Sequence, residues 1–241
     1  VFKNFKDTEF ITTVTVPEGY TQIEGEAFAQ MDGLTKVSLP GSLTNVSYSV
    51  FKDSAKLSDV TFATPADDTK LSFGNNVFQN CTSLTSITLP KSLNSLNNNP
   101  FLGCTNLDSI TIADGNDQYF AENNLVYGKL DDGNSVELAV YPPSSTATEF
   151  TVPETVNNMT VTQIGMHAFR YNDKLTSVTI PATVNSFRTM CFDNCSNLKT
   201  VTLGTTEAPK FGSSSFTNLA AGSTIYVAND TVKKAFEPTD S

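Results

Sequence analysis

The sequence is poor in several residue types on which common chemistries depend. Its 241 residues include no tryptophan, one histidine, four cysteines and two arginines. Lys and Arg total 15 against 25 acidic residues, which gives a net charge of −10. Nucleic acids and anionic membranes bind basic protein surfaces, so this balance argues against both as partners.

Long apolar runs are also missing. No stretch approaches the roughly 18 apolar residues that a membrane-spanning helix needs, so we expect no transmembrane segment in this chain. Only 17% of the residues are charged, whereas Thr, Ser and Asn are abundant. An uncharged polar composition of this kind is typical of extracellular bacterial proteins.

The chain instead contains an internal repeat. The template L-x-x-V-x-L-P recurs with starts separated by 23, 23, 27, 23, 40, 28, 23 and 24 residues. The starts are Ile11, Leu34, Leu57, Leu84, Leu107, Ala147, Leu175, Leu198 and Gly222. Such a fixed period predicts a solenoid, in which units too small to fold alone stack and share one core.

A second signature lies further along each unit, where an apolar residue stands five positions before a phenylalanine. The phenylalanines are Phe28, Phe51, Phe78, Phe101, Phe169, Phe192 and Phe216. The template predicts one strand per unit, with its alternate residues inward, in a long parallel sheet on one side. The Phe column predicts a buried aromatic spine near the opposite, convex wall.

Two units, "LTSITLPKSLNSLNNNPFLGCTN" and "LTSVTIPATVNSFRTMCFDNCSN", show the pattern most fully. They resemble BspA-type leucine-rich repeats, and "VTQIGMHAF" (161–169) is similar to the middle of that family's repeat. The resemblance covers almost the whole chain. It implies a leucine-rich-repeat solenoid, β-rich with short helical turns, whose curved parallel sheet has about nine repeats.

We therefore expect a single repeat domain over 1–241. Two apolar stretches around "DDGN" predict an inserted β-hairpin at about 114–143, and the end resembles a closing turn at about 223–241. The opening "VFKNF" places Phe2 in the Phe column, so the chain begins in the middle of a repeat. We expect further repeats, a cap, or a signal or anchor upstream.

Few residues suggest chemistry. Cys81, Cys104 and Cys195 share one column, which favours small buried side chains, although a Cys81–Cys104 disulfide is geometrically conceivable. A lone histidine, His167, cannot complete a Cys/His zinc site, and its column predicts a polar residue on the convex side. Acidic residues are scattered in turns. We therefore expect no catalytic residue, metal or cofactor.

The solvent side of the predicted concave sheet is the best candidate for binding. One column is nearly all Thr, as an exposed strand position favours, while the columns beside it vary. This variation suits a recognition surface, and it also suits a plain solvated face. The candidate residues are Lys36, Asp59, Ser86, Asp108, Glu149, Ser177, Lys199 and Tyr226.

The inserted hairpin supplies a second candidate, its tyrosines Tyr119, Tyr127 and Tyr141. These rings either pack against the solenoid or contact a sugar or a protein. The family resemblance implies a secreted or cell-surface protein that adheres to host or bacterial surface proteins. Two alternatives remain open, a structural spacer that presents another domain and a surface glycan-binding component.

Overall fold

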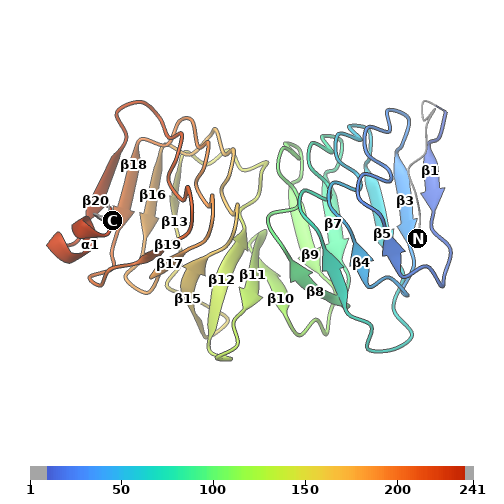
Figure 1. Cartoon of the computed structure of the whole chain (residues 1–241), viewed down its shortest axis with the longest axis horizontal. Coiled ribbons are helices and arrows are strands. Elements are labelled where there is room, and N and C mark those ends of the chain that lie inside the picture. The colour runs from blue at the N-terminus through green and yellow to red at the C-terminus, as the bar shows by residue number, and fades with distance from the viewer. Residues whose placement is uncertain (1–9, 237–241) are drawn as a thin grey trace. The chain divides into compact units, whose positions relative to one another are not determined.

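The computed structural model describes residues 10–236, which wind as a parallel β-solenoid of about nine turns (Figure 1). The chain divides into two compact units. Unit 1 contains the described part of Val1–Val126 together with Tyr141–Ser144, and unit 2 contains Tyr127–Val140 and the described part of Ser145–Ser241. The predicted solenoid is confirmed; the start "VFKNF" lies outside the described residues.

In unit 1 each coil contributes one strand to each of two sides. The template strands are β1 (Thr13–Thr15), β3 (Lys36–Leu39), β5 (Asp59–Phe62), β7 (Ser86–Leu89) and β9 (Ser109–Ile112). The second side holds β2 (Gln22–Ile23), β4 (Asn45–Val46), β6 (Leu71–Phe73) and β8 (Leu93–Leu96) in a four-stranded sheet. Strand β10 (Tyr119–Glu122) follows, and β11 (Leu125–Lys129) runs from unit 1 into unit 2.

Unit 2 repeats this plan. The template strands are β13 (Glu149–Thr151), β16 (Ser177–Ile180), β18 (Thr200–Leu203) and β20 (Thr224–Val227). The second side holds β12 (Ser135–Val140), β15 (Met159–Ile164), β17 (Ser186–Phe187) and β19 (Lys210–Phe211), with β14 (Thr155–Val156) antiparallel to β15. The chain then forms one short helix, α1 (Asp230–Lys234), with Asn229 as its N-cap.

The template strands do not form the single long sheet that the sequence predicts. They hydrogen-bond in three ladders, β1-β3-β5, β7-β9 and β13-β16-β18-β20. The two breaks fall at the 27- and 40-residue spacings. The 28-residue spacing leaves β13 and β16 paired, because its extra residues form the β14–β15 hairpin on the other side. That hairpin turns at Asn157 and Asn158, both at positive φ, as a tight two-residue turn requires.

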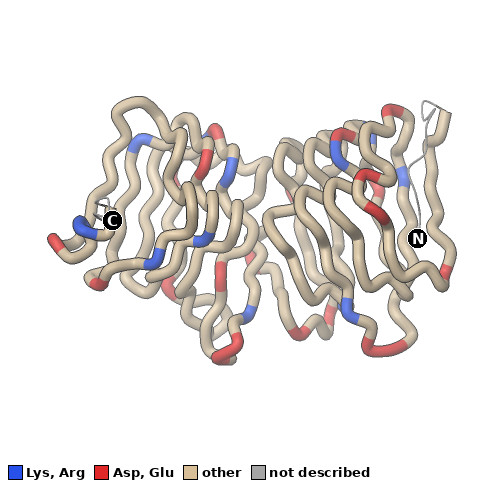
Figure 2. Tube along the Cα trace, in the orientation of Figure 1, with Lys and Arg blue, Asp and Glu red and all other residues tan. Residues whose placement is uncertain are grey.

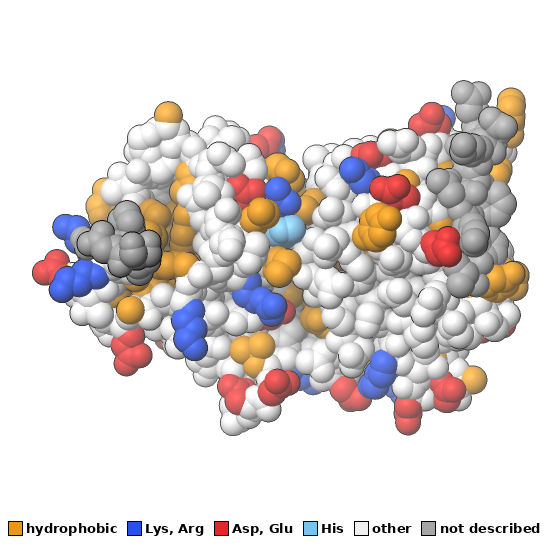
Figure 3. Space-filling model, in the orientation of Figure 1, with side chains coloured by type: hydrophobic (Ala, Val, Ile, Leu, Met, Phe, Trp, Pro, Cys, Tyr) orange, Lys and Arg blue, Asp and Glu red, His pale blue; other side chains and the backbone are white. Residues whose placement is uncertain are grey.

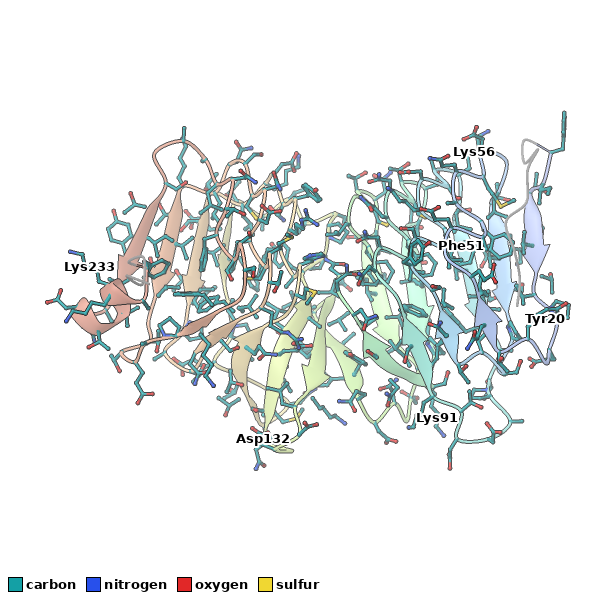
Figure 4. The ribbon with its side chains drawn as sticks, viewed as in Figure 1. Tyr20, Phe51, Lys56, Lys91, Asp132 and Lys233 are labelled. Carbon is teal, nitrogen blue, oxygen red and sulfur yellow. The ribbon has the colours of Figure 1, made fainter. Side chains whose placement is uncertain are left out.

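The predicted Phe spine is confirmed in each unit. Phe28, Phe51, Phe78 and Phe101 are fully buried, and neighbouring rings stack with centroids 5.4 to 5.7 Å apart. Figure 4 shows Phe51 pointing into the coil, whereas Lys56 points outward. In unit 2 Phe169, Phe192 and Phe216 continue the same stacking at 4.6 and 5.2 Å. The rings lie 4.6 to 5.7 Å apart, close to the spacing of paired strands, so stacked aromatic faces fill the side that lacks a strand.

Two backbone positions around each Phe adopt a left-handed conformation that the sequence analysis did not anticipate. The residues two places before and two places after the Phe have positive φ in nearly every coil. The first set is Glu26, Ser49, Asn76, His167, Met190 and Ser214, and the second is Gln30, Asp53, Asn80, Gly103, Tyr171, Asn194 and Asn218. They turn the chain sharply on either side of the buried ring, and a local signal exists because Asn and Gly recur there.

The cysteine column is buried and carries free thiols. The Sγ atoms of Cys81, Cys104 and Cys195 each donate to the carbonyl of the Phe one coil earlier, at 3.0 to 3.2 Å. Ser54 occupies the same column and its hydroxyl donates to the Phe28 carbonyl at 2.8 Å. In these four coils the column residue therefore donates a hydrogen bond to a Phe carbonyl of the preceding coil, which explains why small donors recur there.

Among residues 10–236 no helix is both long enough and apolar enough to cross a membrane. The predicted insertion (114–143) contains β10, β11 and β12, and the predicted closing turn contains β20 and α1. The single-domain organisation remains a prediction.

Candidate interaction surface

The outward residues of the template strands form what we call the strand face, described separately for the two units. It has three columns in each unit. The turn column is Thr35, Ser58, Thr85, Asp108, Thr148, Thr176, Lys199 and Ser223. The second column is Lys36, Asp59, Ser86, Ser109, Glu149, Ser177, Thr200 and Thr224, and the third column is Thr15, Ser38, Thr61, Thr88, Thr111, Thr151, Thr179, Thr202 and Tyr226.

Hydroxyls of the turn column hold neighbouring coils together. Thr35 Oγ1 donates to the Thr12 carbonyl at 3.0 Å, and Thr176 Oγ1 donates to the Thr148 carbonyl at the same distance. Ser223 Oγ donates to the Leu198 carbonyl at 2.9 Å. These side chains belong to the scaffold because they satisfy backbone acceptors of the preceding coil.

The second column varies most in charge. The parallel register places Lys36 beside Asp59, and their side chains form an ion pair at 2.6 Å while staying about half exposed. In unit 2 the register places Glu149 beside Ser177. An exposed pair of this kind contributes only about 0–1 kcal/mol to stability, so stability alone does not explain it.

The third column is a row of hydroxyls that ends in an aromatic ring. Thr61 Oγ1 donates to Ser38 Oγ at 3.2 Å, and Thr88 and Thr111 share a hydrogen bond of 2.9 Å. In unit 2 the column ends at Tyr226, which pairs with Thr202 and is 57% exposed.

The predicted sheet residues are all at least partly exposed, but they do not form one column. Lys36, Asp59, Ser86 and Asp108 lie in unit 1, and Glu149, Ser177, Lys199 and Tyr226 lie in unit 2. Asp108 and Lys199 stand in the turn column, where other coils carry a hydroxyl. The structure brings only Lys36 and Asp59, and separately Glu149 and Ser177, into neighbouring positions.

The hairpin tyrosines are buried. Of the two alternatives, they therefore pack against the solenoid and do not contact a sugar or a protein. Tyr119, Tyr127 and Tyr141 are 6%, 1% and 4% exposed. The Tyr119 hydroxyl accepts a hydrogen bond from the Leu96 amide at 2.9 Å, one coil earlier. An aromatic ring that is covered in this way offers no face to a sugar or a protein.

A hollow of about 480 Å³ lies in unit 1 where the repeat gives way to the insertion, and the sequence analysis missed it. Strand β9, the following turn, β10 and the β10–β11 turn line it. Thr111 of the third column is among the lining residues, so this hollow adjoins the strand face. At its far end Asn124 donates to the Asp108 carbonyl at 2.7 Å.

Charge is spread thinly over the molecule. Figure 2 shows short acidic segments at loops rather than a continuous field of one sign. Two of them are the loop after β5, which contains Asp67 and Asp68, and the β11–β12 turn, which contains Asp131 and Asp132. Hydrogen bonds from Ser135 and from the amide of Asn134 hold the pKa of Asp132 below its ordinary value. These contacts belong to the turn itself.

His167, predicted as a polar residue on the convex side, is buried. It is 9% exposed, and its Nδ1 has no hydrogen-bond partner among the described residues. Burial, with the nearby Arg170 cation, lowers its pKa to about 4, while Asp193 acts in the opposite direction. The imidazole is therefore neutral and packs as part of the turn.

Beside it, Arg170 and Asp193 form the best-connected ion pair of unit 2. Arg170 Nε donates to Asp193 at 2.9 Å, and the guanidinium lies 4.6 Å from the centre of the Tyr171 ring. Burial opposes ionisation of Asp193, but hydrogen bonds from Thr217, Asn194 and other donors outweigh it and lower its pKa. This cluster joins three coils on the Phe side.

Comparison with known proteins identifies the repeat. The BspA-type leucine-rich repeat region matches residues 2–126 and 142–238, in six copies. The chain belongs to the BspA-type leucine-rich repeat family. The gap between the matched segments falls in the β11–β12 insertion, which is not part of the repeat.

Solved leucine-rich-repeat structures share the fold of this BspA-type chain. A leucine-rich repeat protein from Eubacterium ventriosum is 24% identical, with a TM-score of 0.61 over 94% of this chain and 68% of its own. The pneumococcal vaccine antigen PcpA is 18% identical, with a TM-score of 0.59 over 89% of this chain and 67% of its own. No curated protein sequence matches the chain.

Proposed function

We propose that this protein is a secreted or cell-surface binding protein whose strand face contacts other proteins. The family supports an interaction role, since repeat solenoids present extended surfaces made from many coils. PcpA, one of the similar structures, is described as a vaccine antigen, which agrees with a surface location. Adherence to host or bacterial surface proteins is the finer form of the proposal.

The proposal rests on the different contacts that the columns of the strand face make. Turn-column hydroxyls are committed to the preceding coil, whereas the second column places charged side chains in solvent. The exposed Lys36–Asp59 pair adds little stability, and opposite charges held in solvent suit electrostatic recognition of a partner. No catalytic role is proposed for any residue.

A binding screen tests the proposal. The protein is applied to immobilised host matrix proteins and to a glycan array, beside a strand-face variant with Lys36→Ser, Asp59→Ser and Glu149→Ser. All three side chains are exposed or half-exposed, so the variant should have the same melting temperature as the wild-type protein. A protein ligand lost in the variant supports the proposal.

A matched control changes the same number of charges away from the strand face, with Lys56→Ser, Asp68→Ser and Glu154→Ser, which are exposed. Equal loss in both variants would indicate nonspecific charge effects and contradict the proposal. Binding to no protein in the panel would favour the spacer alternative. A hit confined to glycans would favour the surface glycan-binding alternative.

A further inference from the structure

One exposed aromatic ring in unit 1 lies flat against the neighbouring coil. Tyr48 is 54% exposed, and its ring carbons Cε1 and Cζ lie 2.4 Å from the place where a Cβ on Gly25 would stand. Gly25 is therefore the residue that lets the ring rest on the backbone with its other face toward solvent. The ring is thus supported from below and needs no partner of its own to be positioned.

The backbone of the following coil also lies close to Tyr48. A Cβ on Gly74 would stand 2.6 Å from the Tyr48 amide nitrogen, so glycines flank Tyr48 on both sides. Tyr48 stands three residues before the spine ring Phe51. At the equivalent position the other coils carry Gly25, Asn75, Asn98, Met166, Thr189 and Ser213. The repeat therefore does not require an aromatic residue here.

The surroundings of the ring are acidic. Glu24 and Glu26 are exposed and flank Gly25 in the chain, and the Glu26 amide donates to the Tyr48 carbonyl at 3.0 Å. The other polar neighbours on the flanking coil are Asn75 and Asn76. No Lys or Arg occurs in the three coil segments 24–26, 47–49 and 74–76. Figure 3 shows exposed orange side chains on this face of unit 1, with both red and blue side chains nearby.

Unit 2 contains an exposed tyrosine, Tyr171, that already has a cation of the same chain over its ring. Tyr171 is 47% exposed, and the Arg170 guanidinium lies over its ring at 4.6 Å. Among the described residues, Tyr48 has no such cation over its ring. A guanidinium over an aromatic face is favourable, and nearby carboxylates add to the attraction.

We propose that Tyr48, with Glu24 and Glu26, forms a binding site for an arginine side chain of a protein partner. The ring supplies the stacking face and the carboxylates neutralise the guanidinium charge. The inference rests on the proposed function, because it names the chemistry that one contact with a protein partner takes. It adds an anchor outside the strand face.

The test is an NMR titration of the ¹⁵N-labelled protein with N-acetyl-arginine amide and with its neutral isostere N-acetyl-citrulline amide. The expected result is saturating shifts of the amides of residues 24–26 and 47–49. The arginine compound should bind about two- to fivefold more tightly than citrulline, as expected for one exposed cation–π contact. Added salt should reduce that preference.

Three variants locate the contact. Tyr48→Leu should abolish the preference for arginine, and Glu24→Gln with Glu26→Gln should reduce it. Gly25→Ala should also reduce it, because its Cβ displaces the ring without removing it. Tyr171→Leu is the matched control and should leave the titration at residues 24–49 unchanged. All five positions are exposed or partly exposed, and a circular dichroism melt confirms that each variant folds.

Equal affinity for arginine and citrulline, or shifts that persist in Tyr48→Leu, would overturn the inference. Tighter binding of a methyl pyranoside than of the arginine compound would also overturn the inference, since the Tyr48 ring would then recognise a sugar. Each of these results leaves the strand-face screen unaffected. A screen hit that disappears in the strand-face variant would still support the proposed function.

Discussion

Single side chains of the spine fill the part of each coil that has no strand. Phe101 is fully buried and stacks on Phe78 with centroids 5.7 Å apart. A buried ring of this size contributes both its transfer from water and its contacts with both neighbouring coils. Spine rings should therefore be among the most costly residues to truncate.

Phe101→Ala should lower the free energy of unfolding by about 3–5 kcal/mol, measured by urea denaturation. Phe10→Ala is the matched control, because Phe10 is 90% exposed and its loss should change stability by less than about 0.5 kcal/mol. A Phe101→Ala melt that overlays the wild-type melt would rule out the spine as a source of stability.

The buried thiols should not react until the protein unfolds. Burial raises the pKa of Cys104 to about 12, with a backbone hydrogen bond opposing it, and burial also raises the pKa of Cys81, Cys191 and Cys195. Almost no thiolate is then present at pH 8. We expect a thiol reagent to label none of the four cysteines in native protein and all four in denaturant. Rapid native labelling would contradict the burial.

Protonation of His167 should destabilise unit 2 in mild acid. Its pKa falls from 6.5 to about 4 on folding, so the folded state disfavours the cation. The contribution of neutral His167 to the free energy of unfolding is fully present above pH 6.5. It is lost as the pH falls toward 4, by about 3 kcal/mol at most. Arg170 and Asp193 are the charged groups that act on it.

The comparison that isolates this effect is wild type against His167→Asn, since Asn76 adopts the same left-handed conformation in unit 1. The difference in unfolding free energy between the two should shift in favour of the variant between pH 6.5 and 4. A constant difference across that range would show that His167 does not titrate on unfolding.

Whole coils are joined by side-chain hydrogen bonds as well as by the strand ladders. Thr35 and Thr44 donate to carbonyls of the preceding coil, at Thr12 and Thr21, both at 3.0 Å. The abundance of Thr, Ser and Asn thus has a structural cause within the repeat, besides any relation to an extracellular environment. The Thr12 and Thr21 carbonyls each also accept two backbone amides of the following coil, so the hydroxyl adds a further hydrogen bond between the coils.

Thr35→Val with Thr176→Val, two changes in the turn column, should cost about 1–3 kcal/mol in a urea melt, since each lost hydrogen bond is worth about 0.5–1.5 kcal/mol. Lys36→Ser is the matched control on the neighbouring exposed column and should cost less than about 1 kcal/mol. Equal losses would remove the distinction between the turn column and the second column.

At the scale of elements, the sequence predicts the strands and rings that recur with a clear pattern in each repeat, but not the elements that lack such a pattern. The 23-residue period yields the template strands and the Phe spine, because burial imposes the same residue types in every coil. The second strand of each coil was missed, since two-residue strands such as β2 and β4 have too few positions to show alternation. Asn and Gly in the left-handed columns were a usable signal.

At the scale of the whole molecule, the candidate site was predicted less well than the fold. The sequence leaves open whether Tyr119, Tyr127 and Tyr141 pack against the solenoid or contact a ligand, and the structure buries them. Burial inside a single insertion depends on tertiary contacts that no repeated column reveals. The strand-face residues follow from strand alternation and were placed in solvent correctly, whereas their role as a binding surface remains a prediction.

The central claim is that the second column serves recognition and the turn column serves the scaffold. Its most direct test is the affinity of the protein ligand that the screen selects, measured for the strand-face variant and for Thr35→Val with Thr176→Val at equal folded fraction. The account predicts at least a tenfold loss for the strand-face variant, about 1.4 kcal/mol, and no loss for the threonine variant. Unchanged affinity of the strand-face variant would contradict it.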